Sequence, residues 1–313
     1  MFDLRVRAGF ARLAAESWMR MPELGLLNRM RDYVEAMLLA EGLQPSVVNI
    51  AMLVKNFAKL IQVSREGKPF IYQKRHTISL LFDVFAVQSE MAIDAPDELV
   101  LGYTRTMMGF LLFNPDPRQI GMIGLGGGSL AKFCYRYLPD AAIAVAEIDP
   151  GVIALREHFK IPANDARLEV HCIDGADFVR QAESRFDVLM LDGFDRLGLP
   201  QQLCSAQFYD DCYRALAPGG ILVANLFGNA PETPVYLDRL CASFNNTVVS
   251  VDVPDSLNKI AFARKGEPLT LDHAIFNRPG AEVDWGRLVD LASTVRGVHL
   301  AHRAAVLSGE LHS

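Results

Sequence analysis

The stretch that decides the fold is residues 120–129, IGMIGLGGGS, where a short apolar run leads directly into glycines. Glycine permits a tight turn and lets backbone N–H groups approach a ligand, because no Cβ stands in the way. A helix is predicted to follow over residues 130–138. A strand, a glycine turn and a helix in this order are typical of nucleoside-binding α/β folds, although the same glycines also suit a turn that is merely tight. We therefore expect Gly124, Gly126 and Gly128 to line a nucleoside site.

Acidic residues end the next two predicted strands. Glu147 ends the second strand, where a carboxylate can accept hydrogen bonds from both hydroxyls of a ribose, and Asp149 is placed to open the following helix. The third strand ends at Asp174 and Gly175, which suit an adenine amino group and the space for its ring. Together these features predict the Rossmann-like fold of class I S-adenosylmethionine-dependent methyltransferases. A dinucleotide enzyme fits the glycine turn and Glu147, but does not readily explain Asp174.

The fourth predicted strand ends in residues 191–200, LDGFDRLGLP. Ligands bind at the carboxyl edge of such sheets, so Asp192 and Asp195 lie where substrates are expected. Two acids three residues apart on one loop can hold a cationic amine and remove a proton from it. Both residues are therefore candidate catalytic groups.

The order of patterns along the chain predicts three regions. Residues 1–65 have helical periodicity and form a predicted N-terminal extension, and residues 66–117 form a predicted small β-sheet with a linking helix. The turn-rich residues 114–117, NPDP, mark the boundary of a nucleoside-binding catalytic domain over residues 118–313.

Local patterns define further elements. Residues 70–91 are rich in aromatic and branched side chains and predict a small antiparallel sheet. Residues 94–113 predict a helix. In the large domain, apolar runs alternate with helices as in a doubly wound parallel sheet, and residues 247–253 and 259–263 predict a hairpin that gives this sheet an antiparallel C-terminal edge. A terminal helix is expected over residues 285–295.

Composition excludes several classes of protein. Half of the 313 residues are hydrophobic and the net charge is -6, which does not predict nucleic-acid binding. The five cysteines are scattered and form no Cys-x-x-Cys pair, so we expect reduced thiols in a cytoplasmic protein and no metal site. No apolar run has the length of a membrane helix, so stable membrane insertion is not expected.

These motifs resemble those of the spermidine synthase family, the polyamine aminopropyltransferases, in particular a divergent bacterial spermidine synthase-like group. The resemblance covers residues 69–265. It is carried by the glycine turn, by the motif around Glu147, by Asp174-Gly175 and, most specifically, by Asp192-x-x-Asp195 with the residues that follow.

The resemblance implies transfer of an aminopropyl group from decarboxylated S-adenosylmethionine to a diamine such as putrescine, with release of methylthioadenosine. In that reaction Asp192 would accept a proton from the attacking amine and Asp195 would position it. The remaining residues that the resemblance places at the site are Gln88 and Ile148 for the nucleoside, and Gln73 and Tyr103 for the substrates. The family also commonly forms homo-oligomers, so a dimer is expected.

The sequence departs from the family pattern at several positions: Tyr103 matches only with a one-residue shift, the catalytic loop reads Asp-Gly-Phe-Asp-Arg over residues 192–196, and the most consequential departure is in the glycine turn. Gly127 stands where family enzymes carry an aspartate that binds the amino end of the donor. Methyl transfer from S-adenosylmethionine, in which the donor keeps its amino-acid tail, is therefore an alternative function. A third alternative is a non-catalytic homologue that only binds a nucleoside.

Overall fold

The computed structural model describes residues 68–82, 87–195, 198–254, 256–271 and 291–308. The predicted N-terminal extension and most of the predicted helix at 285–295 lie outside these ranges. The chain divides into two compact units. Of the described residues, the first unit contains those up to Tyr72 and those from Leu80 to Gln88. The second unit contains Gln73–Ser79 and the described residues from Ser89 onward. The three regions expected from the sequence stay a prediction.

A small sheet contains the strands β1 (Phe70–Gln73), β2 (Thr77–Leu81) and β3 (Val87–Ala92), in that order. A short turn joins β1 to β2, and in it the Lys74 N–H donates a 2.8 Å hydrogen bond to the Thr77 carbonyl. The antiparallel sheet expected for residues 70–91 is therefore present.

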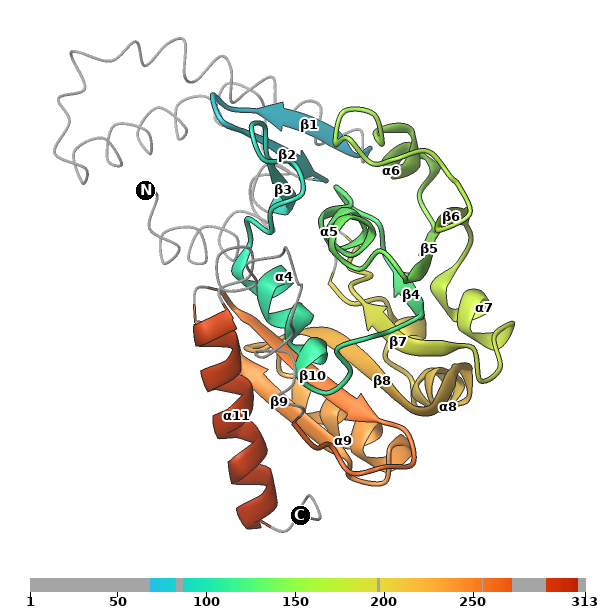
Figure 1. Cartoon of the computed structure of the whole chain (residues 1–313), viewed down its shortest axis with the longest axis vertical. Coiled ribbons are helices and arrows are strands. Elements are labelled where there is room, and N and C mark those ends of the chain that lie inside the picture. Colours follow the sequence, from blue (N-terminus) through green and yellow to red (C-terminus); the bar gives the residue numbers. More distant parts are fainter. Residues whose placement is uncertain (1–67, 83–86, 196–197, 255, 272–290, 309–313) are drawn as a thin grey trace, which may run out of the picture. The chain divides into compact units, whose positions relative to one another are not determined.

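The second unit is built on a seven-stranded sheet with the order β6-β5-β4-β7-β8-β10-β9 (Figure 1). Its strands are β4 (Gln119–Ile123), β5 (Ala142–Glu147), β6 (Leu168–Cys172), β7 (Phe186–Leu191), β8 (Leu216–Phe227), β9 (Val248–Asp252) and β10 (Asn258–Arg264). Neighbours from β6 to β8 pair in parallel, whereas β10 is antiparallel to both β8 and β9. The predicted doubly wound sheet with an antiparallel C-terminal edge is confirmed.

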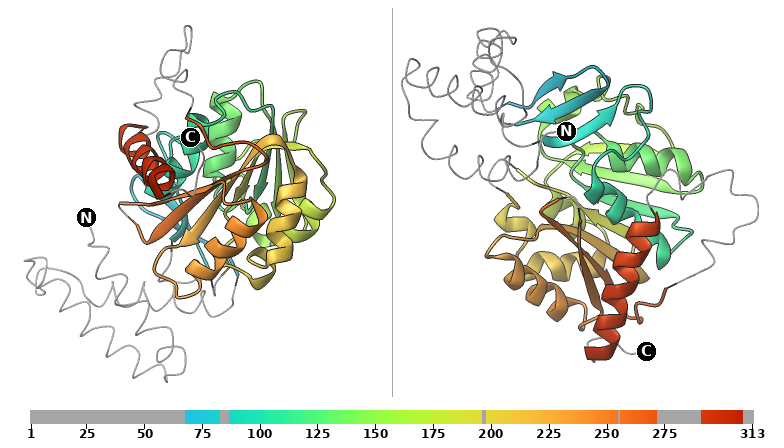
Figure 2. Two further views of the ribbon diagram at one scale, coloured as in Figure 1. Left: turned by 90° about the horizontal axis from the view of Figure 1, so that it is seen from below. Right: turned by 90° about the vertical axis from the view of Figure 1, so that its left-hand side faces the viewer.

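Helices cover both faces of this sheet (Figure 2). One face carries α7 (Gly175–Arg180), α8 (Ala206–Ala215) and α9 (Thr233–Ser243), with the short η3 (Gln201–Leu203) before α8. The helices α4 (Gly102–Met107), η2 (Met108–Leu112) and α11 (Leu291–Ser308) pack together, and α4 and α11 contact β10, β8 and β9. The remaining helices, α5 (Ser129–Tyr137) and α6 (Pro150–Ala154), follow β4 and β5 and pack against β5.

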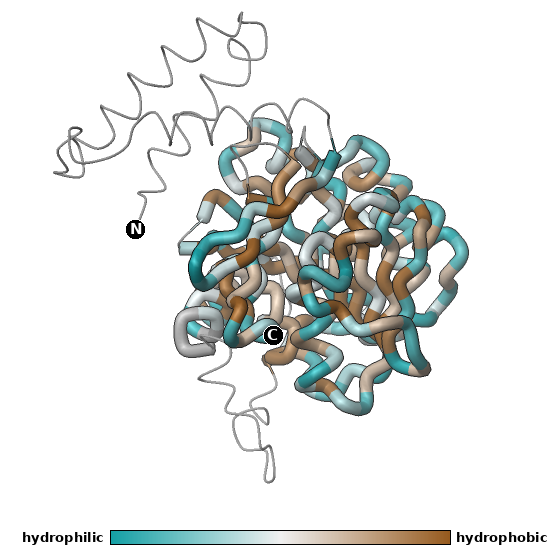
Figure 3. The backbone as a smooth tube through the Cα atoms, turned by 90° about the horizontal axis from the view of Figure 1, so that it is seen from above, coloured by the Kyte–Doolittle hydropathy of each residue, from teal (hydrophilic) through white to brown (hydrophobic). Residues whose placement is uncertain are grey.

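The side chains of β8 point alternately to the two faces of the sheet. Leu222, Ala224 and Leu226 lie in the hydrophobic core with residues of α8 and α9. Since side chains alternate along a strand, Asn225 and Phe227 point to the opposite face. In the tube view, hydrophilic stretches lie on many of the outer turns and hydrophobic stretches lie between them (Figure 3).

Two helices differ from the prediction. The helix expected over residues 94–113 begins only at Gly102 and becomes a 3-10 helix at Met108. Its acidic start forms a turn instead, in which the Glu98 N–H donates to the Ala95 carbonyl. The terminal helix extends to Ser308. In the ranges that the structure describes, no helix has both the length and the apolar character needed to cross a membrane.

Candidate active site

The glycine turn between β4 and α5 has a backbone that other residues would strain. Gly124, Gly126 and Gly128 have φ angles of 92°, 51° and 67°, which lie in the left-handed region. A Cβ on Gly124 would also lie 2.3 Å from the backbone oxygen of Asp192, and one on Gly128 would lie 2.5 Å from the side chain of Ile161. The turn therefore requires glycine at these positions and brings β4 directly against the end of β7.

Glu147, at the end of β5, is held beneath this turn. Its side chain is 8% exposed, and its two carboxylate oxygens accept hydrogen bonds of 2.9 Å from the backbone N–H groups of Leu125 and Asp149. Asp149 accepts from the Gly151 N–H and caps α6, as the sequence predicts. Beside these polar contacts, Ile148 is 60% exposed, which is unusual for a large aliphatic side chain at the end of a buried strand.

Asp174 follows β6 and caps α7 through a 2.7 Å hydrogen bond from the Ala176 N–H to Oδ1. Gly175 packs against β4, because a Cβ there would lie only 2.4 Å from Cγ2 of Ile123. The sequence assigned Gly175 to the space for a ligand ring, whereas the contact that requires glycine in the structure is with this strand. The adenine contact of Asp174 stays a prediction.

Asp192 lies just after β7 in a network of polar side chains. Its Oδ1 accepts a 2.8 Å hydrogen bond from Nδ2 of Asn225, and its Oδ2 accepts a 3.2 Å hydrogen bond from the Tyr103 hydroxyl of α4. Asn225 in turn accepts a 2.9 Å hydrogen bond from Nδ2 of Asn258. Three separate elements, α4, β8 and β10, thus position one carboxylate.

Burial raises the pKa of the Asp192 carboxyl above its usual value, against the opposing effect of the hydrogen bonds from Asn225 and Tyr103. The pKa of Tyr103 is raised by its burial and then by the neighbouring charge of Asp192, so its hydroxyl stays a neutral donor. A carboxylate with a raised pKa is better suited to accept a proton near neutral pH than an ordinary aspartate.

No motif in the sequence singles out Asn225 or Asn258 as part of the site. Asn225 is a 2% exposed polar residue within the otherwise apolar second half of β8, and a buried polar group in an apolar strand requires a partner. That signal was available in the sequence. The partners were not, because β7, β8 and β10 come together only through the order of strands in the sheet.

Asp195 lies three residues beyond Asp192 and is exposed. Its backbone N–H donates to the Gly198 carbonyl at 2.9 Å, and the Gly198 N–H donates back at 3.4 Å, so the loop closes on itself here. The structure thus gives the two acids different environments, since Asp192 is partly buried in a polar network and Asp195 faces solvent at the rim of the same loop.

Position 127 is closely packed. A Cβ on Gly127 would lie 2.7 Å from Oγ of Ser89 and 2.9 Å from the ring of Phe159. Nearby, the buried Lys132 donates a 2.8 Å hydrogen bond to the Phe159 carbonyl, and burial lowers the pKa of this lysine to about 8. An aspartate at 127 would require these neighbours to move, which gives a physical reason for the glycine.

The helix predicted over residues 130–138 begins one residue earlier in the structure, at Ser129. The N-cap of α5 is Gly128, and Ser129 is the first residue inside the helix. Its hydroxyl lies 3.4 Å from that of Ser89, and both side chains are buried. Gly128 has a left-handed conformation and ends the glycine turn, so the helix begins directly after it.

The two predicted glutamines are on the small sheet. Gln88 is a residue of β3 and belongs to the first compact unit, whereas the glycine turn belongs to the second. Gln73 ends β1 and is exposed. Their assignment to the site therefore stays a prediction.

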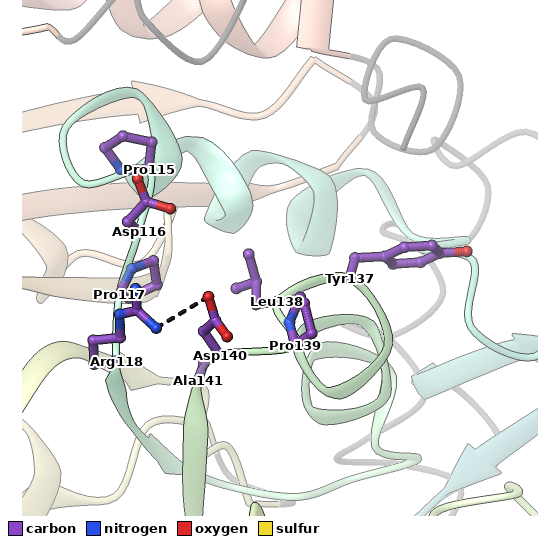
Figure 4. A pocket seen from close by; sticks show the side chains of 9 residues that line it. All are labelled: Pro115, Asp116, Pro117, Arg118, Tyr137, Leu138, Pro139, Asp140 and Ala141. Atoms are coloured by element: carbon purple, nitrogen blue, oxygen red, sulfur yellow. Dashed lines mark ion pairs between the residues drawn. The ribbon is translucent and has the colours of Figure 1, made fainter. Parts of the chain in front are cut away.

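A surface pocket lies at the other edge of the large sheet. Its lining comes from residues 115–118, before β4, and 137–141, before β5, and includes a 3.0 Å ion pair between Arg118 and Asp140 (Figure 4). Because β4 and β5 are parallel, this is their amino edge, whereas Glu147 and Asp192 follow the carboxyl ends of strands. The pocket is therefore separate from the candidate site. In the described part of the chain, His, Cys, Asp and Glu side chains form no group of three that could hold a metal ion.

Two solved structures share this fold at low sequence identity. A probable spermidine synthase from Corynebacterium glutamicum has a TM-score of 0.56 at 20% identity, over 63% of this chain and 76% of that one. A spermidine synthase solved with the transition state analogue AdoDATO has a TM-score of 0.57 at 19% identity, over 76% of this chain and 87% of the other. They support the predicted methyltransferase-like fold.

Sequence comparison identifies the family. The family model described as the spermine/spermidine synthase domain matches residues 100–247. A polyamine aminopropyltransferase of Chromobacterium violaceum is 39% identical over 209 residues, which are 66% of this chain and 77% of that protein. One from Neisseria meningitidis serogroup A is 36% identical over 184 residues, 58% of this chain and 70% of the relative. With this degree of identity over most of the relatives' length, the chain belongs to the spermine/spermidine synthase family and is a transferase.

Proposed function

We propose that the protein transfers the aminopropyl group of decarboxylated S-adenosylmethionine to a primary amine of a diamine such as putrescine, and releases methylthioadenosine. The observation that carries this proposal is the carboxylate of Asp192, held by Tyr103 and Asn225 at the carboxyl edge of the sheet. Relatives named polyamine aminopropyltransferase support the same reaction and do not favour methyl transfer or a purely binding role.

The nucleoside part of the donor would lie across the glycine turn. Glu147 would accept hydrogen bonds from the ribose hydroxyls, and Ile148, which is 60% exposed, would cover one face of the adenine. Asp174 uses Oδ1 to cap α7, which leaves Oδ2 for the adenine amino group. The assignment of Gln88 to the nucleoside stays a prediction from the family resemblance.

The proposed reaction needs little more than alignment and one proton acceptor. The acceptor ammonium loses a proton to Asp192, and the lone pair of the resulting amine attacks the carbon next to the sulfonium. As the new C–N bond forms, the C–S bond breaks and its electrons return to sulfur, which becomes the neutral thioether of methylthioadenosine. The nitrogen of the product therefore carries one positive charge, and the sulfur is neutral. The partly buried position of Asp192 favours this transfer, because a raised pKa makes the carboxylate a stronger base.

The position of Asp195 suits a different role. It is exposed at the rim of the loop, so its charge would attract the substrate amine rather than take its proton. Gln73 and Tyr103 are the other proposed substrate contacts, and Tyr103 already bonds to Asp192. The homodimer and the cytoplasmic location expected from the sequence stay predictions.

The experiment that tests the proposal uses the full-length protein with decarboxylated S-adenosylmethionine and a panel of amines. Mass spectrometry should detect an amine enlarged by one aminopropyl group and an equal amount of methylthioadenosine. Parallel reactions with S-adenosylmethionine serve as the control for methyl transfer. Methylated product from the latter, with no aminopropyl product from any amine, would contradict the proposal.

A further inference from the structure

Exposed apolar side chains gather next to the Asp192 network. Phe227 is 47% exposed and Leu257 is 42% exposed, and the ring of Phe194 packs edge-on against that of Phe227 with centroids 6.3 Å apart. Leu257 is tied to the same place because its carbonyl accepts a 2.7 Å hydrogen bond from the Gly228 N–H. Large exposed hydrophobic side chains that cluster in this way mark binding sites more often than isolated ones.

The register of the strands places this cluster beside the proposed base. Phe227 is two residues beyond Asn225 on β8, so both side chains lie on the same face of the sheet. Asn258 lies opposite Phe227 across the β8–β10 pair and donates to Asn225, which confirms the shared face. Asn225 donates a 2.8 Å hydrogen bond to Asp192. Phe227 therefore lies next to the proposed site, farther along β8 from the carboxylate than Asn225.

We propose that Phe194, Phe227 and Leu257 form an apolar wall that selects acceptor amines with a long hydrocarbon chain, in preference to putrescine. This inference rests on the proposed function and names its acceptor class. The reacting nitrogen lies at Asp192, the methylene groups after it lie along Phe194 and Phe227, and a distal ammonium reaches water past Leu257.

The chemistry of the wall supports this class. Burial of each methylene contributes about 0.8 kcal/mol, which is about a fourfold change in affinity per carbon. Aromatic faces also attract an ammonium group, so a diamine loses little by carrying its second charge along such a wall. A short diamine would leave most of the wall in contact with water.

The test measures kcat/KM for a series of linear α,ω-diamines from three to eight carbons, with decarboxylated S-adenosylmethionine as the donor. In the unaltered protein the eight-carbon diamine should exceed putrescine by about tenfold or more, mainly through a lower KM. In Phe227→Ser this ratio should fall toward one. Leu307→Ser is the matched control, since Leu307 is 83% exposed at the end of α11, and it should keep the full ratio.

A second measurement does not depend on turnover. Titration calorimetry of the diamines into the protein saturated with methylthioadenosine should give a heat-capacity change that becomes more negative with chain length. This trend should be lost in Phe227→Ser and kept in Leu307→Ser, after circular dichroism has shown that both variants fold.

The outcomes separate the two proposals. The apolar wall would be overturned if the unaltered protein used putrescine at least as well as longer diamines. It would also be overturned if Phe227→Ser kept the full preference for longer diamines. Either result would leave aminopropyl transfer in place. The wall would equally be overturned if both variants lost the chain-length dependence. Absence of aminopropyl product from every diamine would instead overturn the proposed function itself.

Discussion

The amide of Asn225 donates a 2.8 Å hydrogen bond to Oδ1 of Asp192, and so joins the middle of the sheet to the proposed catalytic base. The same amide accepts from Asn258, which fixes which of its ends faces the carboxylate. A hydrogen bond to the charged form of an acid favours ionisation. Asn225 therefore positions Asp192 and limits the rise in its pKa.

Asn225→Leu removes this donor while keeping the number and branching of the side-chain heavy atoms. The pKa of Asp192 should then rise further, so the acidic limb of the pH profile of kcat should move to higher pH. Affinity for methylthioadenosine, measured by calorimetry, should stay unchanged, because Asn225 is not among the proposed nucleoside contacts. Asn258→Leu should shift the limb in the same direction by a smaller amount. An acidic limb that coincides with that of the unaltered protein would contradict the assignment.

Asp192→Asn should lower kcat by about 10²- to 10⁴-fold, the usual contribution of a positioned general base. Both neighbours keep a partner, because the amide oxygen accepts from Asn225 and the amide NH2 can donate to the Tyr103 hydroxyl. Methylthioadenosine binding should therefore persist. A variant with near-normal turnover would remove Asp192 from the proposed mechanism.

The same substitution makes a prediction about stability. Burial raises the pKa of Asp192 in the folded state above its unfolded value, so the folded state binds the proton more tightly. The stabilisation from this group is present at low pH and is lost as the pH rises through the folded pKa. The free energy of unfolding of Asp192→Asn minus that of the unaltered protein should therefore be larger at pH 8 than at pH 4. Urea denaturation at the two pH values measures both differences. An equal difference at the two pH values would contradict this.

Gly127→Ala should destabilise the protein by about 1–3 kcal/mol, the usual cost of overpacking. The reason is steric, since the new Cβ would lie 2.7 Å from Oγ of Ser89 and 2.9 Å from the Phe159 ring. Gly297→Ala in α11 is the matched control, because its nearest neighbour would be Val251 at 3.7 Å. Thermal unfolding should show a loss for the first and none for the second. Equal melting temperatures would mean that the packing does not explain the glycine.

Residues at the ends of parallel strands could be located from sequence. Each apolar run ends where a polar residue or glycine begins, and all carboxyl ends of parallel strands meet at one edge. This is why the glycine turn, Glu147, Asp174 and Asp192 were predicted at strand ends, and in the structure they lie at or just after the ends of β4 to β7. The antiparallel β10 was also predictable, because the turn before it is too short for a crossover helix.

Contacts between distant segments could not be read in the same way. The bond from Tyr103 to Asp192 joins residues 89 positions apart, and the Asn225 and Asn258 bonds each span 33. The packing reason for a glycine at position 127 could not be predicted either, because the ring of Phe159, in the segment after α6, packs against this position. Periodicity describes which face a residue occupies, but not which side chain meets it across the fold.

Glu147→Gln should weaken methylthioadenosine binding by about tenfold to a hundredfold, in line with the 1.5–3 kcal/mol of hydrogen bonds to charged groups. Both carboxylate oxygens accept from backbone N–H groups, those of Leu125 and Asp149. A glutamine offers one oxygen, so its NH2 would face one of these donors and disturb the turn. The melting temperature should therefore fall as well. Unchanged nucleoside affinity, measured by calorimetry on the folded variant, would exclude Glu147 from the site.

Asp174 allows its two roles to be separated. Asparagine is also a good N-cap, so Asp174→Asn should keep the hydrogen bond from the Ala176 N–H and leave the melting temperature nearly unchanged. Its NH2 group would replace the oxygen proposed to accept from the adenine amino group, so affinity for methylthioadenosine should fall. Asp174→Ala should lose both the cap, at about 1 kcal/mol, and the affinity. If Asp174→Asn bound the nucleoside as well as the unaltered protein, Asp174 would be a helix cap alone and the adenine contact would have to come from another residue.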